Sequence, residues 1–170
     1  MISALTVLGA EESATDRRNW SYLGLADELQ RRSARPAEDK RELFRRVVFN
    51  ALVSNTDDHP RNHALVAPGR DWVLAPAYDL TPDPVRSTER RDLAMECGRF
   101  GRVARRDNLF SESPRFGLTA AAANTIIDEM RNIVEREWED AIRSEGGVET
   151  DVRAVARAFV YEGFEYGSLP

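Results

Sequence analysis

The polar segment at residues 54–81 places the strongest constraint on how this chain can fold. It reads SNTDDHPRNHALVAPGRDWVLAPAYDLT and holds both histidines of the protein beside several aspartates and asparagines. Burying such side chains without partners costs ~2–7 kcal/mol for each polar group. The fold must therefore satisfy these groups mutually or present them at a functional surface, and the rest of the chain serves to support them.

The helix that leads into this segment has the clearest pattern in the sequence. We expect it over residues 37–55, with acids in its first turns, where the helix dipole favours them. Its apolar residues recur at i, i+3, i+4, i+7 and i+8, and they are Phe44, Val47, Val48, Ala51 and Leu52. The pattern predicts that Arg41, Arg45 and Arg46 face outward.

Four further helices are predicted from the spacing of apolar residues and from helix-stop signals. They cover residues 2–8, 20–32 and 120–144, and a last one is capped by Thr150 or Asp151. The glycine pair after residue 144 ends the third of them. The supporting structure is therefore mostly helical.

A short β-hairpin is the one sheet element that the sequence predicts. Residues 64–67 and 72–74 flank the turn sequence PGRD. Residues 83–117, in contrast, are expected to be irregular, with one short strand or helical turn at residues 93–95. The predicted fold class is mostly α, of the α+β type, in one domain over residues 1–170.

Composition narrows the class of protein further. The chain has 170 residues, a net charge of −5 and 31% charged residues, which indicates a globular protein without a broad nucleic-acid-binding face. Its single cysteine, Cys97, excludes an internal disulfide and fits a reducing compartment. No apolar run approaches the ~20 residues of a membrane helix, and the N-terminus lacks the basic start of a secretory signal. We therefore expect a cytoplasmic protein.

Three oxygen-bearing side chains in the polar segment have a spacing that suits phosphoryl transfer. Asn62 follows Asp57 after one tight loop, and Asp79 returns after the hairpin. In this arrangement Asp57 would orient or accept the proton of an acceptor hydroxyl. The amide oxygen of Asn62 and the carboxylate of Asp79 would bind Mg²⁺, which bridges the phosphates of ATP.

Simpler roles exist for the same residues. Asp and Asn often cap their own loops, and Asp58, next to Asp57, is expected to point away as a cap or into solvent. We expect His59 to brace the loop by hydrogen bonding, and a zinc site formed with His63 is disfavoured because Pro60 breaks helical spacing. The arginines from residue 99 to residue 106 could contact phosphate or an acidic substrate, or could form a solvated loop.

The sequences TDDHPRN and WVLAPAYD together resemble the catalytic loop and metal loop of HipA-type serine/threonine kinases, the toxins of bacterial toxin–antitoxin modules. The resemblance covers nearly the whole chain and implies the helical C-terminal lobe of a protein-kinase-like fold. It implies that Asp57 is the catalytic base and that Asn62 and Asp79 bind Mg²⁺ and, through it, ATP. It also implies a protein substrate and a small helix-turn-helix antitoxin as partners.

The chain departs from that family in one respect. We find no N-terminal β-rich lobe, no glycine-rich phosphate loop and no lysine suited to ATP, because GRFG at residues 98–101 is too short and the only lysine, Lys40, opens a surface helix. We therefore expect a C-terminal lobe that is inactive or weakly active alone and that needs the missing lobe.

Two other functions stay open at this point. The chain could be a non-catalytic module that keeps the fold and binds an antitoxin or the missing lobe. It could also be a magnesium-dependent hydrolase that uses the same oxygen ligands, in which case it would hydrolyse its substrate without a partner.

Overall fold

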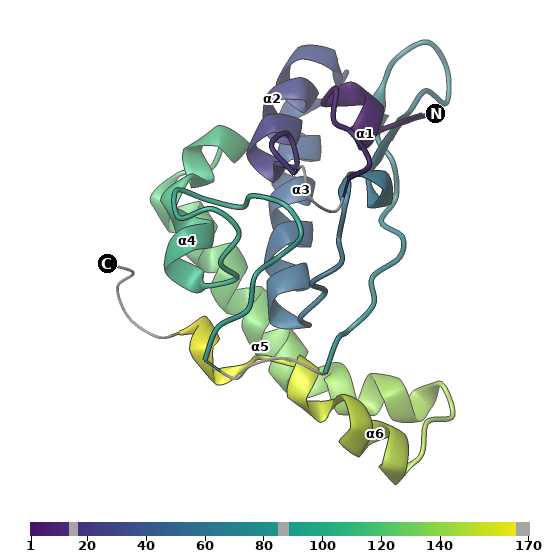
Figure 1. Cartoon of the computed structure of the whole chain (residues 1–170), viewed down its shortest axis with the longest axis vertical. Helices are drawn as coiled ribbons and strands as arrows, with labels where there is room; N and C mark the ends of the chain where they lie inside the picture. The colour runs from purple at the N-terminus through teal and green to yellow at the C-terminus, as the bar shows by residue number, and fades with distance from the viewer. Residues whose placement is uncertain (14–16, 85–88, 166–170) are drawn as a thin grey trace.

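The computed structural model describes residues 1–13, 17–84 and 89–165, and it is dominated by helices (Figure 1). The α-helices are α1 (Ala4–Val7), α2 (Tyr22–Arg32), α3 (Pro36–Leu52), α4 (Arg106–Ser111), α5 (Ala120–Ser144) and α6 (Glu149–Val155). Short 3-10 helices are η1 (Pro60–Asn62), η2 (Ser113–Phe116), η3 (Ala156–Ala158) and η4 (Glu162–Phe164). The strands are β1 (Ile2–Ser3), β2 (Ala64–Val66) and β3 (Val73–Leu74). The mostly helical fold class is confirmed.

The predicted hairpin is present, and a third strand joins it. β2 pairs antiparallel with β3, and β1 pairs antiparallel with the other edge of β2, with Ile2 opposite Leu65. The predicted helix at residues 2–8 is therefore wrong at its start. Its helical part is limited to Ala4–Val7, and the Ala4 amide donates to the His63 carbonyl at 2.8 Å. This pairing ties the N-terminus to the polar segment.

Helix α3 is the centre of the core. It packs between α2 and α5, and its buried face includes Leu43, Phe44 and Val47. The ring of Phe44 lies 5.2 Å from that of Phe116 in η2. Each such side chain contributes about 1.5–3 kcal/mol when it is fully buried. The helix therefore fixes the position from which the polar segment begins.

Two basic side chains of α3 are buried, contrary to the prediction from sequence. Arg46 was expected to face outward, but it donates to the Ala75 carbonyl at 2.7 Å and pairs with Glu42. Lys40 was expected on a surface, but its ammonium group donates to Gln30 Oε1 at 2.6 Å. At these two positions, hydrogen bonds to residues on other elements outweigh the preference of a charged side chain for solvent. Arg46 thereby attaches the chain after β3 to α3.

The stretch at residues 83–117 is more ordered than its sequence indicates, in the parts that the structure describes. Residues 93–95 are buried loop instead of a strand, while helix α4 was not predicted. The GRFG sequence is a tight turn against α4, because a Cβ at Gly98 would lie 2.0 Å from the Asn108 carbonyl oxygen. Close packing therefore accounts for this glycine without a phosphate.

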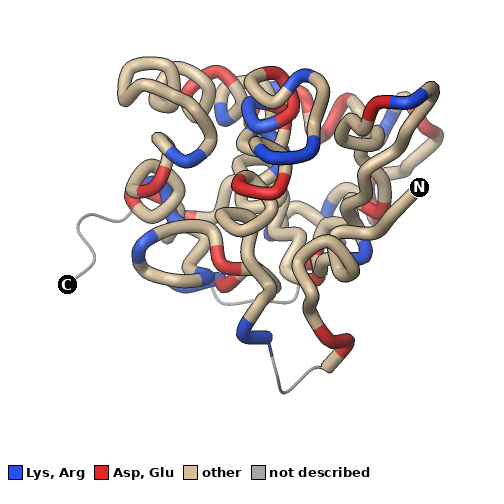
Figure 2. The backbone as a smooth tube through the Cα atoms, turned by 90° about the horizontal axis from the view of Figure 1, so that it is seen from above, with Lys and Arg blue, Asp and Glu red and all other residues tan. Residues whose placement is uncertain are grey.

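Helix α5 matches its predicted bounds, whereas the predicted cap of the last helix at Thr150 or Asp151 is wrong, because α6 is capped at Val148. Thr119 caps α5 by accepting from the Ala122 amide at 3.2 Å, and α6 begins at Glu149, with Asp151 accepting from the Val148 amide at 2.9 Å. In Figure 1, α6 and the end of α5 lie at the end of the molecule opposite α1 and α2. Figure 2 shows acidic and basic residues interspersed over most of the backbone. No described helix could span a membrane.

Candidate active site

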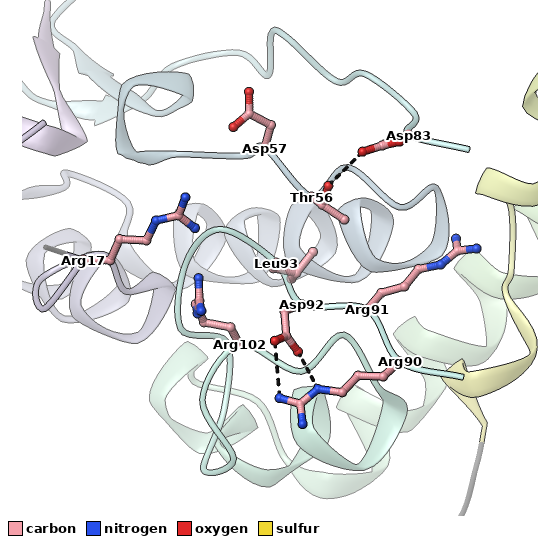
Figure 3. A pocket seen from close by; sticks show the side chains of 9 residues that line it. All are labelled: Arg17, Thr56, Asp57, Asp83, Arg90, Arg91, Asp92, Leu93 and Arg102. Atoms are coloured by element: carbon pink, nitrogen blue, oxygen red, sulfur yellow. Dashed lines mark hydrogen bonds and ion pairs between the residues drawn. The ribbon is translucent and has the colours of Figure 1, made fainter. Parts of the chain in front are cut away.

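The loop between α3 and β2 carries the predicted catalytic aspartate. Ser54 turns the chain out of α3 with a left-handed φ of 57°, and Asp57 follows with an exposed side chain. Asp57 lies at the wall of an open cavity of about 780 Å³ (Figure 3). The other lining residues are Arg17, Thr56, Asp83, Arg90, Arg91, Asp92, Leu93 and Arg102. A substrate could therefore reach the Asp57 carboxylate from solvent.

The segment that carries Asp79 lies along this loop. The Tyr78 hydroxyl donates to the Arg61 carbonyl at 2.6 Å, and Asn55 Nδ2 donates to the Asp79 carbonyl at 3.4 Å. Asp79 itself has a left-handed φ of 59°, a conformation that aspartate tolerates better than most residues. These hydrogen bonds bring the immediate neighbours of Asn62 and Asp79 together, although the two residues are 17 positions apart in the chain.

The three predicted site residues are placed differently with respect to solvent. Asp57 and Asp79 are exposed, whereas Asn62, in η1, is only 5% exposed. Asp57 lines the cavity, but Asn62 and Asp79 are outside its lining. Within the described part of the chain, none of the three side chains makes a hydrogen bond or an ion pair. The Asn62 residue is nearly buried, but its amide atoms keep some contact with solvent, because none of them is a fully enclosed atom without a partner.

Asp58 is the centre of a buried hydrogen-bond network, so of the two roles expected for it, a cap or a solvent-facing side chain, the second is wrong. Its Oδ2 atom accepts from the Tyr22 hydroxyl, from Asn50 Nδ2 at 2.6 Å and from His63 Nε2 at 2.7 Å. Asn50 Oδ1 in turn accepts from Asn55 at 3.1 Å, and Asn55 also contacts the Asp79 segment. The network therefore connects α2 and α3 to both loops of the candidate site.

The bracing role expected of His59 belongs to His63. His63 is 2% exposed and is held by Asp58, whereas the ring of His59 packs edge-on to Trp20 at 6.3 Å and its Nδ1 atom has no hydrogen-bond partner. The brace is therefore His63, not His59. The sequence offered one signal for this network: Asn50 is a polar residue beside the apolar stripe of the α3 pattern.

Burial sets the protonation behaviour of the network. Burial, followed by the charge of Asp58, raises the pKa of Tyr22 well above its ordinary value, so its hydroxyl remains a donor. On the other side of the loop, burial lowers the pKa of Arg91. The Arg91 guanidinium donates to Ser54 Oγ and to the Ala158 and Arg157 carbonyls, and it lies over the Tyr161 ring at 4.5 Å. We call this set of contacts the Arg91 clamp.

The donor chemistry of the site suits a hard cation better than zinc. No group of three or more His, Cys, Asp or Glu side chains that could hold a metal occurs among residues 1–13, 17–84 and 89–165. His63 is already engaged by Asp58, which removes it from the zinc pair considered above. An amide oxygen and an unpaired carboxylate, at Asn62 and Asp79, are ligand types that Mg²⁺ accepts together with water and phosphate oxygens.

The arrangement of a helical lobe around a small antiparallel sheet and a polar loop defines a kinase-like fold. The HipA toxin of Shewanella oneidensis, solved with HipB and operator DNA, shares this fold with a TM-score of 0.70. The alignment covers 92% of this chain and 40% of the HipA chain, at 18% sequence identity. The chain belongs to the HipA-like C-terminal domain family, whose model matches residues 1–138.

Two curated relatives come from Sinorhizobium fredii and are named as kinases. "Putative kinase Y4mE" is 29% identical over 118 residues, which is 66% of this chain and 28% of the relative. "Putative kinase Y4dM" is 36% identical over 66 residues, which is 38% of this chain and 15% of the relative. The matched regions therefore span less than a third of either relative.

Proposed function

We propose that this chain is the catalytic lobe of a HipA-type serine/threonine kinase, which transfers the γ-phosphate of ATP to a protein hydroxyl with Mg²⁺. The observation that carries the proposal is the hydrogen bond from Tyr78 to the Arg61 carbonyl, which joins the Asp79 segment to the loop of Asp57 and Asn62. Asn62 and Asp79 are the immediate neighbours of the two bonded residues, and Asp57 lies in the same loop as Asn62; among the described residues none of the three side chains has a hydrogen-bond partner. Family membership supports the same chemistry.

Each of the three residues would have a distinct role. Asp57, exposed at the cavity wall, would accept the hydrogen bond of the incoming hydroxyl and orient it for attack. Asn62 and Asp79 would hold Mg²⁺ through their side-chain oxygens. The bound cation would supply charge neutralisation for the transferred phosphate. The buried Asp58 network would keep both loops in place without contacting the substrate.

The remaining parts of the machinery would come from outside this chain. Its only lysine, Lys40, is bonded to Gln30 in the core and is not available to ATP. The relatives and the structural neighbour are longer, so we assign the nucleotide lysine and phosphate loop to a further lobe of such proteins. The neighbour is a toxin solved with HipB and DNA, and by analogy we propose a helix-turn-helix antitoxin partner for this protein.

The alternative is a non-catalytic module that binds the antitoxin or the absent lobe. The buried state of Lys40 favours it, because the chain alone offers no lysine for nucleotide. The two functions share a fold and differ in whether Asp57 and Asp79 have chemical roles.

Calorimetric titration of the chain with Mg²⁺ and ATP tests the metal site. The kinase proposal expects Asp79→Asn to weaken Mg²⁺-dependent ATP binding by about tenfold or more, because one anionic ligand is lost. Asp71→Asn, an exposed aspartate in the hairpin turn, is the matched control and should have no effect. Equal Mg²⁺-dependent binding by wild type and Asp79→Asn contradicts the ligand assignment.

A transfer assay tests the catalytic role. The chain is combined with the N-terminal lobe of a longer HipA-type relative, and phosphate transfer to protein is measured with labelled ATP. Asp57→Asn should reduce transfer by at least ~100-fold. Transfer that is insensitive to this substitution rules out the kinase mechanism. A complex that forms with normal affinity but transfers no phosphate in the wild type favours the non-catalytic module.

A further inference from the structure

A second cavity lies at the end of the molecule formed by α5 and α6, apart from the residues that line the Asp57 cavity. It has a volume of about 580 Å³ and is bounded by the end of α3, the second half of α5, and α6. We call it the α5–α6 groove. Its apolar surface is formed by Phe49, Val53, Ile133, Val134, Trp138 and Phe159.

The floor of this groove is ordered and apolar. The rings of Trp138 and Phe159 stack at 4.6 Å with an interplanar angle of 17°. Ile133 also lines the groove and is 44% exposed. A contiguous apolar hollow that is open to solvent is typical of an interaction site, because covering such a surface releases water and lowers the free energy of the system.

The rim of the groove carries an excess of negative charge. Three acids and no lysine or arginine are among the described residues that line it. Glu137, Glu145 and Asp151 lie at the groove itself. Arg136 pairs with Glu137, but Glu145 makes no ion pair within the described residues. The groove therefore suits a partner that is apolar along its centre and positively charged along its edges.

The walls of the groove also restrict the backbone of that partner. They are mainly helical surfaces, whose backbone groups are already bonded within each helix, and the three strands lie elsewhere in the fold. An extended peptide would find no strand edge there to pair with its backbone. A helix brings its own backbone hydrogen bonds and can lay an apolar face into such a groove.

We propose that the α5–α6 groove binds an amphipathic, basic helix of a partner protein, with apolar anchors at i, i+3 or i+4, and i+7 between flanking Lys or Arg residues. This inference does not depend on the proposed kinase activity, since the groove shares no lining residue with the Asp57 cavity. The groove and the polar segment are nevertheless adjacent in sequence. Val53 lines the groove, and the next residue, Ser54, begins the polar segment.

The test uses the full chain and two synthetic helical peptides. Both have leucines at the anchor positions, and their flanking positions carry lysine in one peptide and glutamate in the other. Binding is followed by calorimetry and by the fluorescence of Trp138 in the groove floor. The proposal expects the lysine peptide to bind at least tenfold more tightly at low salt, and this difference to shrink as salt is added.

Two pairs of variants locate the binding site. Ile133→Gln should weaken binding of the lysine peptide about tenfold, whereas Asn132→Gln, at the exposed neighbouring position, should leave it unchanged. Glu145→Lys should weaken it severalfold, whereas Glu129→Lys, exposed on α5 outside the groove, should not. All four positions are exposed, so circular dichroism should show folded chains.

Three outcomes would overturn the proposal. The first is equal affinity for the two peptides, and the second is binding that Ile133→Gln does not affect. The third is self-association of the chain, measured by sedimentation, that Ile133→Gln abolishes, because a second copy would then be the occupant.

Discussion

The Nε2 atom of His63 lies 2.7 Å from Oδ2 of Asp58, in a part of the core that solvent hardly reaches. The preceding residue, Asp57, has its carboxylate exposed at the cavity wall. Two consecutive aspartates thus have opposite surroundings, and among the described residues only the side chain of the buried one makes hydrogen bonds. This contrast separates the residue that holds the loop from the residue proposed to act on substrate.

Asp58→Asn should destabilise the protein by about 3 kcal/mol. The substitution removes the charge that three donors share, and it places an amide donor against them. Urea unfolding followed by circular dichroism measures the change. Asp57→Asn is the matched control, and its effect on unfolding free energy should stay within about 0.5 kcal/mol because the side chain is exposed. Similar losses of unfolding free energy in both variants would contradict a structural role for Asp58 alone.

Arg91→Met should cost about 3 kcal/mol of unfolding free energy. The Arg91 clamp would be lost, which leaves the Ser54 hydroxyl and the Arg157 carbonyl without this donor, while the Ala158 carbonyl keeps only the Ser54 hydroxyl. Arg99→Met, at an exposed arginine of the turn before α4, should change stability by less than about 0.5 kcal/mol. Both are measured by urea unfolding, and a loss below about 1 kcal/mol for Arg91→Met would contradict the clamp.

Cys97 should be unreactive while the protein is folded. Its thiol is 1% exposed, and burial raises its pKa well above the ordinary value, so the reactive thiolate is scarce. We expect labelling by an aromatic disulfide reagent at pH 8 to be about a thousandfold slower than for a small free thiol. Addition of urea should accelerate it in step with unfolding. Rapid labelling of the native chain would show that the thiol is accessible.

Tyr161 should make the protein lose stability at alkaline pH. Burial raises its pKa to about 12, and its hydroxyl donates to the Ala104 carbonyl at 2.5 Å. A raised pKa means that the folded state holds the proton more tightly, so the contribution is complete below about pH 10, the pKa of unfolded tyrosine. About 2 kcal/mol should be lost between about pH 10 and pH 12.

Unfolding free energies of the wild type and Tyr161→Phe, measured by urea at several pH values, test this contribution. The variant should lose about 1 kcal/mol at pH 7 with its hydrogen bond and should decline less steeply above pH 10. Tyr22, whose pKa is also raised, should keep part of the decline in both proteins. Parallel curves for the two proteins would exclude Tyr161 as a source of the pH dependence.

The elements with long periodic patterns could be predicted from the sequence. Helices α3 and α5 have 17 and 25 residues, so their apolar positions recur over several turns. Strand β1 has two residues and α4 has six, which is too short for either periodicity to emerge. Their structure depends on partners distant in the chain, as in the pairing of Ile2 with Leu65.

The candidate site, like the fold, could be predicted from the sequence only in part. Its polar loop and the residues Asp57, Asn62 and Asp79 could be selected from spacing and family resemblance, and their roles stay predictions. The burial of Asp58 could not be predicted, because it depends on Tyr22, which is 36 positions away in helix α2. Asp57 and Asp58 are chemically identical, and only the folded chain determines which of them is enclosed.

The Arg91 clamp also bears on where this domain can be divided. The family match ends at residue 138, inside helix α5, whereas Arg91 donates to the carbonyls of Arg157 and Ala158. A chain cut at residue 138 would lose both acceptors and keep only the contact of Arg91 with Ser54. The end of the family match and the end of the packed structure thus fall at different places, because residues 139–165 hold part of the anchor of Arg91.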